Sequence, residues 1–541
     1  MTVVLPVRHQ VPLPDTLIRV APPSPEAIEL DVLIVGAGPA GLACAIQLAR
    51  TAPDLAIGVL EKAGSLGEHS LSGAVINPVA LRALFPDKKD DEFPFRQPVS
   101  GEAVYFLTES GSSRIPTPPT MKNHGNFTVS LCELVRWLGE QAEALGINIF
   151  PGFPAESLLV DGGRVIGVHT VTGGLDRESN PTDVFQEPTD LVAKVVVLAE
   201  GTRGPLAQAW RDWQKVGSEN PQIFALGVKE VWEVSKPLDR VIHTMGWPLP
   251  RDAFGGSWCY PMGPNQLSIG LVVGLDYHDA GLDVHESLQR LKLHPLFRPL
   301  LEGGTMVEWG AKTIPEGGYY AIPNRLSGDG LLMIGDTAGF VDVPSLKGIH
   351  YAMESGMLAA ATIAATLRDG GAGDAVPLAA YDAAVRESRI VRDMHKTRNM
   401  RLAFKDGFFG GAMKAGLMTL TGGAFPGGRI AMPADAEAPR RSHAQPAFVP
   451  DNVLTFSKVD AVFKAGNATR DTIPSHLMVG RDITGEVADF YAHLCPAGVY
   501  ERDGDTLRVN PPNCVDCKAT DVLGPRWTPR EGGSGPKYRL M

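Results

Sequence analysis

The sequence has no apolar run long enough to cross a lipid bilayer, although 44% of its 541 residues are hydrophobic. A spanning helix would need about eighteen or more such residues in succession. Cysteine is also scarce: six residues are too few for a disulfide framework in so long a chain, which indicates a reducing compartment. Basic residues do not dominate, because the net charge is −11, and we therefore expect no nucleic-acid partner.

The first thirty residues lack the features of a targeting segment. They are rich in proline and contain Asp15, Glu26 and Glu29. They have neither the compact apolar core of a secretory signal nor the acid-poor composition of a mitochondrial transit peptide. We therefore expect residues 1–30 to be an irregular tail.

What the chain does contain is a dinucleotide-binding turn, in which an aliphatic strand leads through three spaced glycines into a helix over Leu42–Arg50. In this fingerprint the helix N-terminus receives a pyrophosphate. A second strand over Ala56–Leu60 ends at Glu61, about twenty residues after the last glycine, where an acidic side chain holds a ribose hydroxyl. A glycine-rich turn without a ligand is the alternative interpretation. The predicted contacts are Gly36, Ala37, Gly38, Pro39, Ala40, Gly41, Glu61 and Lys62.

A second turn far downstream favours FAD over a nicotinamide cofactor. A buried strand over Leu331–Ile334 ends at Asp336, whose carboxylate would accept a ribityl hydroxyl of the long FAD molecule. A helix N-cap aspartate is the other interpretation. The helix that begins near Gly348 would direct its N-terminus at the flavin pyrimidine edge. The predicted contacts from this part of the chain are Ser72, Gly73, Glu200, Gly201, Arg203, Gly335, Asp336, Gly348 and Ile349.

Several longer phrases resemble electron transfer flavoprotein–ubiquinone oxidoreductases from about residue 30 to the C-terminus. They are Leu71–Ala74, Leu226–Trp232, Val241–Pro248, Gly274–Tyr277, Glu316–Tyr319, Gly356–Ala360 and Cys495–Tyr500. Related flavin reductases of the FixC and geranylgeranyl reductase type lack the last of these. The resemblance implies FAD, an iron–sulfur cluster, a ubiquinone pocket and shallow membrane attachment.

The implied activity is the transfer of electrons from reduced electron transfer flavoprotein to ubiquinone. The flavin would accept these electrons one at a time and pass two of them to the quinone. No catalytic base is expected, because the donor is a protein. The enzyme would be peripheral, on the cytoplasmic side of a bacterial inner membrane rather than in a mitochondrion. The alternatives are a flavin reductase or hydroxylase of a lipid-like substrate with a degenerate cluster domain, and a non-catalytic flavoprotein.

The cluster region departs from the family pattern. The resemblance implies Cys495, Cys514 and Cys517 as ligands, but Thr520 stands where the family has a fourth cysteine. A four-iron cluster usually has four thiolates. Asp521 offers a carboxylate oxygen next to that position, although oxygen is a harder ligand. A four-iron cluster with a non-cysteine ligand, a three-iron cluster and no cluster at all remain open.

Two further segments carry implied roles. The glycine-rich stretch Phe254, Gly255 and Gly256 matches the place where the family's quinone approaches bare backbone, and a plain glycine hairpin is the alternative. The apolar residues of Phe404–Leu417 suit an interfacial helix, with Arg401, Lys405 and Lys414 near lipid phosphates. Core packing is the alternative for that segment.

Since 541 residues are too many for one core, we expect several domains. The predicted fold class is α/β and α+β: a Rossmann-like FAD-binding domain interleaved with a mixed-sheet quinone-binding domain, and a small C-terminal ferredoxin-like domain. The expected boundaries are 31–220 and 326–385 for the FAD-binding domain, 221–325 for the quinone-binding domain, 386–450 for an amphipathic segment and linker, and 451–541 for the iron–sulfur domain.

Overall fold

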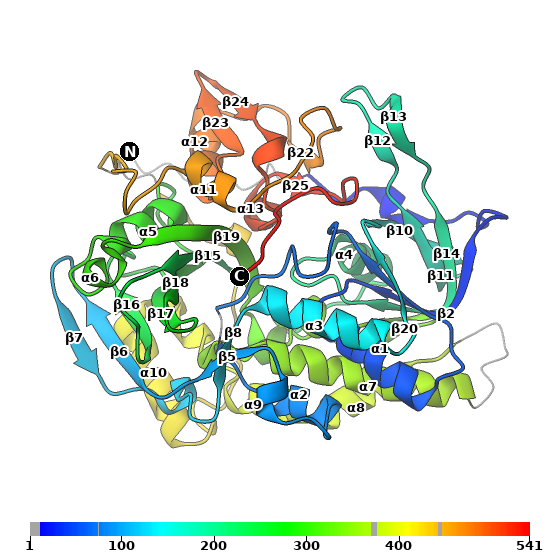
Figure 1. The fold of residues 1–541 in the computed structure, drawn as a ribbon, viewed down its shortest axis with the longest axis horizontal. Coiled ribbons are helices and arrows are strands. Elements are labelled where there is room, and N and C mark those ends of the chain that lie inside the picture. The colour runs from blue at the N-terminus through cyan, green and yellow to red at the C-terminus, as the bar shows by residue number, and fades with distance from the viewer. Residues whose placement is uncertain (1–10, 74, 369–375, 442–445) are drawn as a thin grey trace.

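The computed structural model describes residues 11–73, 75–368, 376–441 and 446–541, and two large sheets dominate it (Figure 1). The first sheet has the order β1-β10-β11-β14-β2-β3-β9, with β21 paired to β14 and β20 to β21. Its strands are β1 (Ile18–Arg19), β2 (Ile28–Val35), β3 (Ile57–Glu61), β9 (Asn148–Pro151), β10 (Ala155–Asp161), β11 (Arg164–Thr170), β14 (Asp190–Leu198), β20 (Ser327–Gly328) and β21 (Leu331–Met333).

The centre of this sheet is parallel, and helices cover it. Strands β14, β2 and β3 run in parallel, and the second half of β2, residues 32–35, is a continuous aliphatic run because both of its faces are buried. Helices α1 (Pro39–Thr51) and α7 (Ile349–Arg368) pack closely together. A Cβ at Gly356 would lie 2.3 Å from the carbonyl oxygen of Ala40, so a glycine on α7 is what permits this approach.

The second sheet has the order β19-β15-β18-β17-β16-β6-β7. Its strands are β6 (Glu102–Leu107), β7 (Ser112–Ile115), β15 (Phe224–Glu233), β16 (Val241–Gly246), β17 (Gly255–Pro261), β18 (Gln266–Gly274) and β19 (Thr305–Pro315). Strands β6 and β7 come from the region between two strands of the first sheet, and β6 pairs in parallel with β16. The two sheet domains are therefore interleaved along the chain, and the predicted fold class is confirmed.

The remaining helices and small sheets cover these two sheets. The helices are α2 (Val79–Leu84), α3 (Leu131–Glu143), α4 (Pro205–Trp213), α5 (Val284–Lys292), α6 (Arg298–Leu301), α8 (Ala379–Glu387) and α9 (Arg389–Lys396). The short strands are β4 (Val75–Ile76), β5 (Phe95–Pro98) and β8 (Phe127–Val129) in one sheet, and β12 (Gly173–Leu175) with β13 (Pro181–Gln186) in another.

The expected irregular tail is only partly irregular. Residues 1–10 lie outside the described part of the chain, but β1 adds a strand to the first sheet by pairing in parallel with β10. Strand β2 also begins three residues earlier than expected, at Ile28. The apolar residue Leu17 between the prolines is buried, which gives this segment a core contact that its composition did not reveal.

The C-terminal domain and helix α10 (Phe408–Leu420) lie at different edges of the molecule, the domain at the top of Figure 1 and α10 near the bottom. The domain consists of α11 (Lys458–Lys464), β22 (Leu477–Met478), α12 (Gly485–Leu494), β23 (Tyr500–Asp503), β24 (Thr506–Val509), α13 (Ala519–Leu523) and β25 (Arg526–Trp527). Its apolar residues share one hydrophobic cluster with the second sheet. Among the described residues, no helix is both long and apolar enough to cross a membrane.

Candidate functional site

A cavity of about 950 Å³ lies where the parallel strands of the first sheet end. Residues from the ends of β2, β3 and β14 line it, at the edge where open α/β sheets bind their ligands. Of the predicted site residues, those lining the cavity are Gly36, Gly38, Pro39, Ala40, Glu61, Lys62, Ser72, Gly73, Glu200, Gly201, Phe254, Gly255, Gly256, Asp336, Gly348 and Ile349. One cavity thus brings together both predicted flavin turns and the predicted quinone segment.

The first turn has the shape that a pyrophosphate requires. Gly36 has a φ of +110°, and a Cβ there would lie 2.3 Å from the carbonyl oxygen of Ala199, so the position demands glycine. Gly38 is the N-cap of α1 and makes no side-chain cap, and the space around its missing Cβ is open. The N-terminus of α1 therefore borders the cavity with bare backbone, which favours an anion.

Three of the predicted contacts that line the cavity are carboxylates, Glu61, Glu200 and Asp336. Glu61 accepts hydrogen bonds from the backbone of Ala37 at 3.1 Å and of Ala63 at 2.8 Å, which hold it beside the turn. Glu200 accepts one from Ala207 at 2.8 Å, and burial raises its pKa. Burial also raises the pKa of Asp336 to about 6. A buried acceptor at that position suits a ribityl hydroxyl, and the FAD therefore fits both turns.

Four predicted cofactor contacts do not line the cavity. Ala37 and Gly335 belong to the two turns, and a Cβ at Gly41 would lie 2.1 Å from the carbonyl oxygen of Gly36, so Gly41 serves helix packing. Arg203 donates a hydrogen bond to Asp521 at 2.6 Å and so joins the first sheet domain to the C-terminal domain. Contact of these four residues with the cofactor stays a prediction.

The quinone segment is part of a strand. Gly255 and Gly256 begin β17, which pairs antiparallel with β16 and β18, and their contact with a quinone stays a prediction. A Cβ at Gly256 would lie 2.4 Å from the carbonyl oxygen of Thr244, because the sheet is crowded there. The result is bare backbone on the cavity wall. Helix α10 borders the same end of the cavity with Ala412, Ala415, Gly416, Thr419 and Leu420.

The cavity wall also contains two lysines that were not predicted from the sequence, the half-buried Lys312 and the buried Lys518. Lys312 on β19 donates a hydrogen bond to the carbonyl oxygen of Asp516 at 3.2 Å, and burial lowers its pKa to about 8. Burial also lowers the pKa of Lys518, which donates to the carbonyl oxygen of Arg203 at 3.0 Å. The position of Lys518 directly after Cys517 was a usable signal, whereas nothing near Lys312 in sequence indicated its role.

The three candidate cluster ligands lie together in the C-terminal domain. Cys495 follows α12, and Cys514 and Cys517 lie in the loop before α13. All three are buried, and burial raises the pKa of each thiol, that of Cys514 to about 12. Each thiol therefore stays protonated unless iron replaces the proton, and three converging cysteines fit an iron–sulfur cluster.

The cysteine loop contacts the cavity wall directly. The backbone N–H of Thr313 donates to the carbonyl oxygen of Cys517 at 3.0 Å, and Thr313 lines the cavity. The next residue, Lys518, lines the cavity as well. Cys517 is therefore connected to the cavity wall in two ways, by its hydrogen bond with Thr313 and by its peptide bond to Lys518.

These features define the class: a flavin-dependent oxidoreductase with an additional iron–sulfur domain. Solved structures agree on the fold. A geranylgeranyl bacteriochlorophyll reductase-like protein from Thermoplasma acidophilum has a TM-score of 0.54 and 19% identity, covering 74% of this chain and 97% of its own. The flavin-dependent brominase Bmp2 has a TM-score of 0.50 and 19% identity, covering 73% and 94%. At such identities the likeness concerns the fold alone.

The particular family follows from the sequence relatives. The ETF-QO ubiquinone-binding model matches residues 224–314, the electron transfer flavoprotein-ubiquinone oxidoreductase 4Fe-4S model matches 452–539, and a Thi4 family model matches 24–83. The mitochondrial electron transfer flavoprotein-ubiquinone oxidoreductase of Arabidopsis thaliana is 38% identical over 95% of this chain and 85% of its own. The human protein of that name is 36% identical over 95% and 90%.

The chain belongs to the electron transfer flavoprotein–ubiquinone oxidoreductase family. The predicted family, enzyme class and overall function are thereby confirmed, as are FAD and an iron–sulfur cluster as the cofactors. The alternative, a flavin reductase or hydroxylase of a lipid-like substrate with a degenerate cluster domain, is less well supported, because the family's own 4Fe-4S model matches that domain.

Proposed function

We propose that electrons from reduced electron transfer flavoprotein enter at the C-terminal domain, pass to FAD, and reduce a ubiquinone that reaches the cavity past α10. The observation that carries the proposal is the single cavity shared by the flavin turns, by Phe254–Gly256 and by α10. The contact between Cys517 and Thr313 supports transfer from the cysteine loop to the flavin. FAD supplies the change from one-electron to two-electron chemistry.

A bulky residue at Gly416 should obstruct the quinone. Gly416 lines the cavity on α10, and no atom lies within 4 Å of the position of its missing Cβ, so a leucine there would enter open space. We expect Gly416→Leu to lower the rate of ubiquinone reduction about tenfold, a barrier increase of about 1.4 kcal/mol. Reduction of a small water-soluble acceptor by the flavin should stay unchanged.

The matched control is Gly410→Leu on the same helix. Gly410 also has no atom within 4 Å of its missing Cβ, but it does not line the cavity. Both substitutions raise helix propensity equally. Equal quinone rates in the two variants would contradict quinone entry past α10, whereas a defect with every acceptor would indicate damage to the flavin site instead.

We further propose that α10 lies in one leaflet of a membrane, on the cytoplasmic side of a bacterial inner membrane. Its outward residues Phe409, Met413 and Leu420 are 71%, 66% and 85% exposed. Such a row of apolar side chains on one helix suits an interfacial position. Arg401 has no part in this surface, contrary to the sequence-based expectation, because it is buried between Asp276 and Glu316 at 2.9 and 2.8 Å.

Charges on the outer face of α10 should release the protein from lipid. Each exposed apolar side chain is worth about 1.5–3 kcal/mol when it is buried in an apolar phase. We therefore expect Phe409→Asp with Met413→Asp to weaken binding to anionic lipid vesicles more than tenfold in a sedimentation assay. Neither residue lines the cavity, so reduction of a water-soluble acceptor should persist.

The control for this experiment is Val184→Asp on β13, an apolar side chain that is 53% exposed and far from α10 in the sequence. It should bind vesicles like the parent protein. If the parent protein does not sediment with vesicles, or if Val184→Asp weakens binding as much as the α10 variants do, α10 is not the membrane surface.

A further inference from the structure

The described residues supply three thiolates to the cluster site and no fourth. The other cysteines of the chain, Cys44, Cys132 and Cys259, lie in α1, α3 and β17. All are buried in the two sheet domains or between them. A four-iron cluster with four protein thiolates is therefore not available to this fold, and a different group must occupy the fourth corner.

The two neighbouring carboxylates are already engaged. Asp521 accepts hydrogen bonds from Arg203 at 2.6 Å, from Arg526 at 3.2 Å and from the backbone of Trp527 at 3.0 Å. Asp516 accepts from Arg530 at 2.9 Å and also pairs with Lys62. Moving either carboxylate to an iron would leave buried arginines without their counter-charge, at a large energetic cost. The structure therefore disfavours Asp521 as the fourth ligand.

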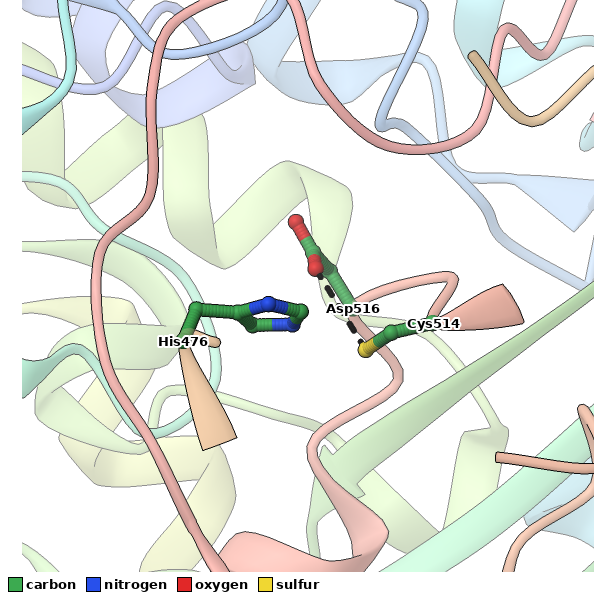
Figure 2. A group of neighbouring side chains, drawn as sticks. All are labelled: His476, Cys514 and Asp516. Carbon is green, nitrogen blue, oxygen red and sulfur yellow. Dashed lines mark hydrogen bonds between the residues drawn. The ribbon is translucent and has the colours of Figure 1, made fainter. Parts of the chain in front are cut away.

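His476 lies beside Cys514 and Asp516 (Figure 2), and neither Cys495 nor Cys517 belongs to this group. The ring of His476, the Cys514 thiol and the Asp516 carboxylate have ligand atoms within 4.8 Å of one another. Neither ring nitrogen has a hydrogen-bond partner in the part of the chain that the structure describes. The trio is no separate metal site, since Asp516 is neutralised by Arg530 and Lys62.

Tyr500, in contrast, lies near all three cysteines, and Thr520 lies beside Tyr500. Thr520 follows Cys517 by three residues, as Cys517 follows Cys514, and it is buried in the first turn of α13. Tyr500 is buried as well, at 2% exposure. Its hydroxyl is buried and meets no hydrogen-bond geometry with any described residue.

We propose that Cys495, Cys514 and Cys517 would hold the cluster, and that the protein offers no thiolate to its fourth iron, because Thr520 stands at the remaining position. This iron has no protein thiolate and is therefore exchangeable. A one-electron oxidant should convert the cluster as follows: [4Fe-4S]²⁺ gives [3Fe-4S]⁺, one Fe²⁺ and one electron, which the oxidant takes up. Added Fe²⁺ and a reductant should restore the four-iron form.

The test uses the full-length protein, purified without oxygen, with its own FAD as the internal standard. Iron content and the EPR spectrum are measured before and after treatment with ferricyanide. We expect about four iron atoms per FAD initially and about three after oxidation, with the EPR signal of an oxidised three-iron cluster. Ferrous iron with dithionite should return the count to about four. No donor flavoprotein or quinone enters these measurements, so a fourth iron that resists oxidation would overturn this inference and leave the proposed electron transfer untouched, whereas a protein without iron would contradict both.

The decisive variant is Thr520→Cys, which adds the missing thiolate. It should keep about four irons per FAD through the same oxidation and show no three-iron signal. A second variant, His476→Ala, should behave like the parent protein. The proposal is overturned if the parent keeps four irons after oxidation, if it contains no iron when purified anaerobically, or if His476→Ala alone removes the fourth iron, because histidine would then be the ligand.

Discussion

Replacing Lys292 with methionine is expected to lower the free energy of unfolding by about 3–5 kcal/mol, the typical cost of breaking a buried ion pair from one side. Lys292 on α5 donates hydrogen bonds to both carboxylate oxygens of Glu230 on β15, at 2.9 and 2.8 Å, and both side chains are completely buried. The substitution leaves the buried charge of Glu230 without a counter-charge, next to the hydrophobic cluster that the second sheet shares with the C-terminal domain. Chemical denaturation followed by tryptophan fluorescence measures the loss.

Two variants separate charge from packing. The double variant Glu230→Gln with Lys292→Met has no buried charge and should recover most of the stability. Arg298→Met removes a similar cation from the exposed pair with Glu302, whose side chains are 56% and 53% exposed, and should cost no more than about 1 kcal/mol. A loss for Lys292→Met as small as that for Arg298→Met would show that Glu230 tolerates burial without its partner.

Replacing Gly36 with valine is expected to give a protein that binds FAD roughly tenfold to a hundredfold more weakly. A φ of +110° is strained for any residue with a Cβ, and the new atom would lie 2.3 Å from the carbonyl oxygen of Ala199. The end of β14 and the first turn must therefore move apart, and the turn loses its shape. Flavin absorbance per protein after gel filtration measures the loss.

The controls for Gly36→Val distinguish strain from loss of the site. Gly146→Ala also places a Cβ at positive φ, +78°, but in a loop that does not line the cavity, so FAD content should stay normal. Gly38→Val has open space for its side chain and an unstrained φ of −77°, but it lines the cavity. It should reduce FAD binding without lowering stability. Normal FAD content in both Gly36→Val and Gly38→Val would contradict the assignment of the turn.

The sequence by itself determined the features that depend on neighbouring residues. Glycine spacing after an aliphatic strand predicted the first turn, and Gly36 and Gly38 line the cavity as expected. Leu131, Leu134, Val135 and Leu138 recur at helical spacing, and they form the buried face of α3, which begins at Leu131. Such signals survive because backbone conformation responds mainly to residues close in sequence.

Only the tertiary structure decided which distant groups meet. The sequence placed Arg401 near lipid and offered Asp521 to iron, but folding buries Arg401 beside Glu316 and pairs Asp521 with Arg203. Folding also places Lys312 between the cavity and the cysteine loop, although no sequence motif indicated this lysine. The reason is physical: a buried charge must find a counter-charge from whichever element packs against it, and that partner is hundreds of residues away for Arg203 and Asp521. The residues near a charged side chain in the sequence therefore do not predict which distant residue pairs with it.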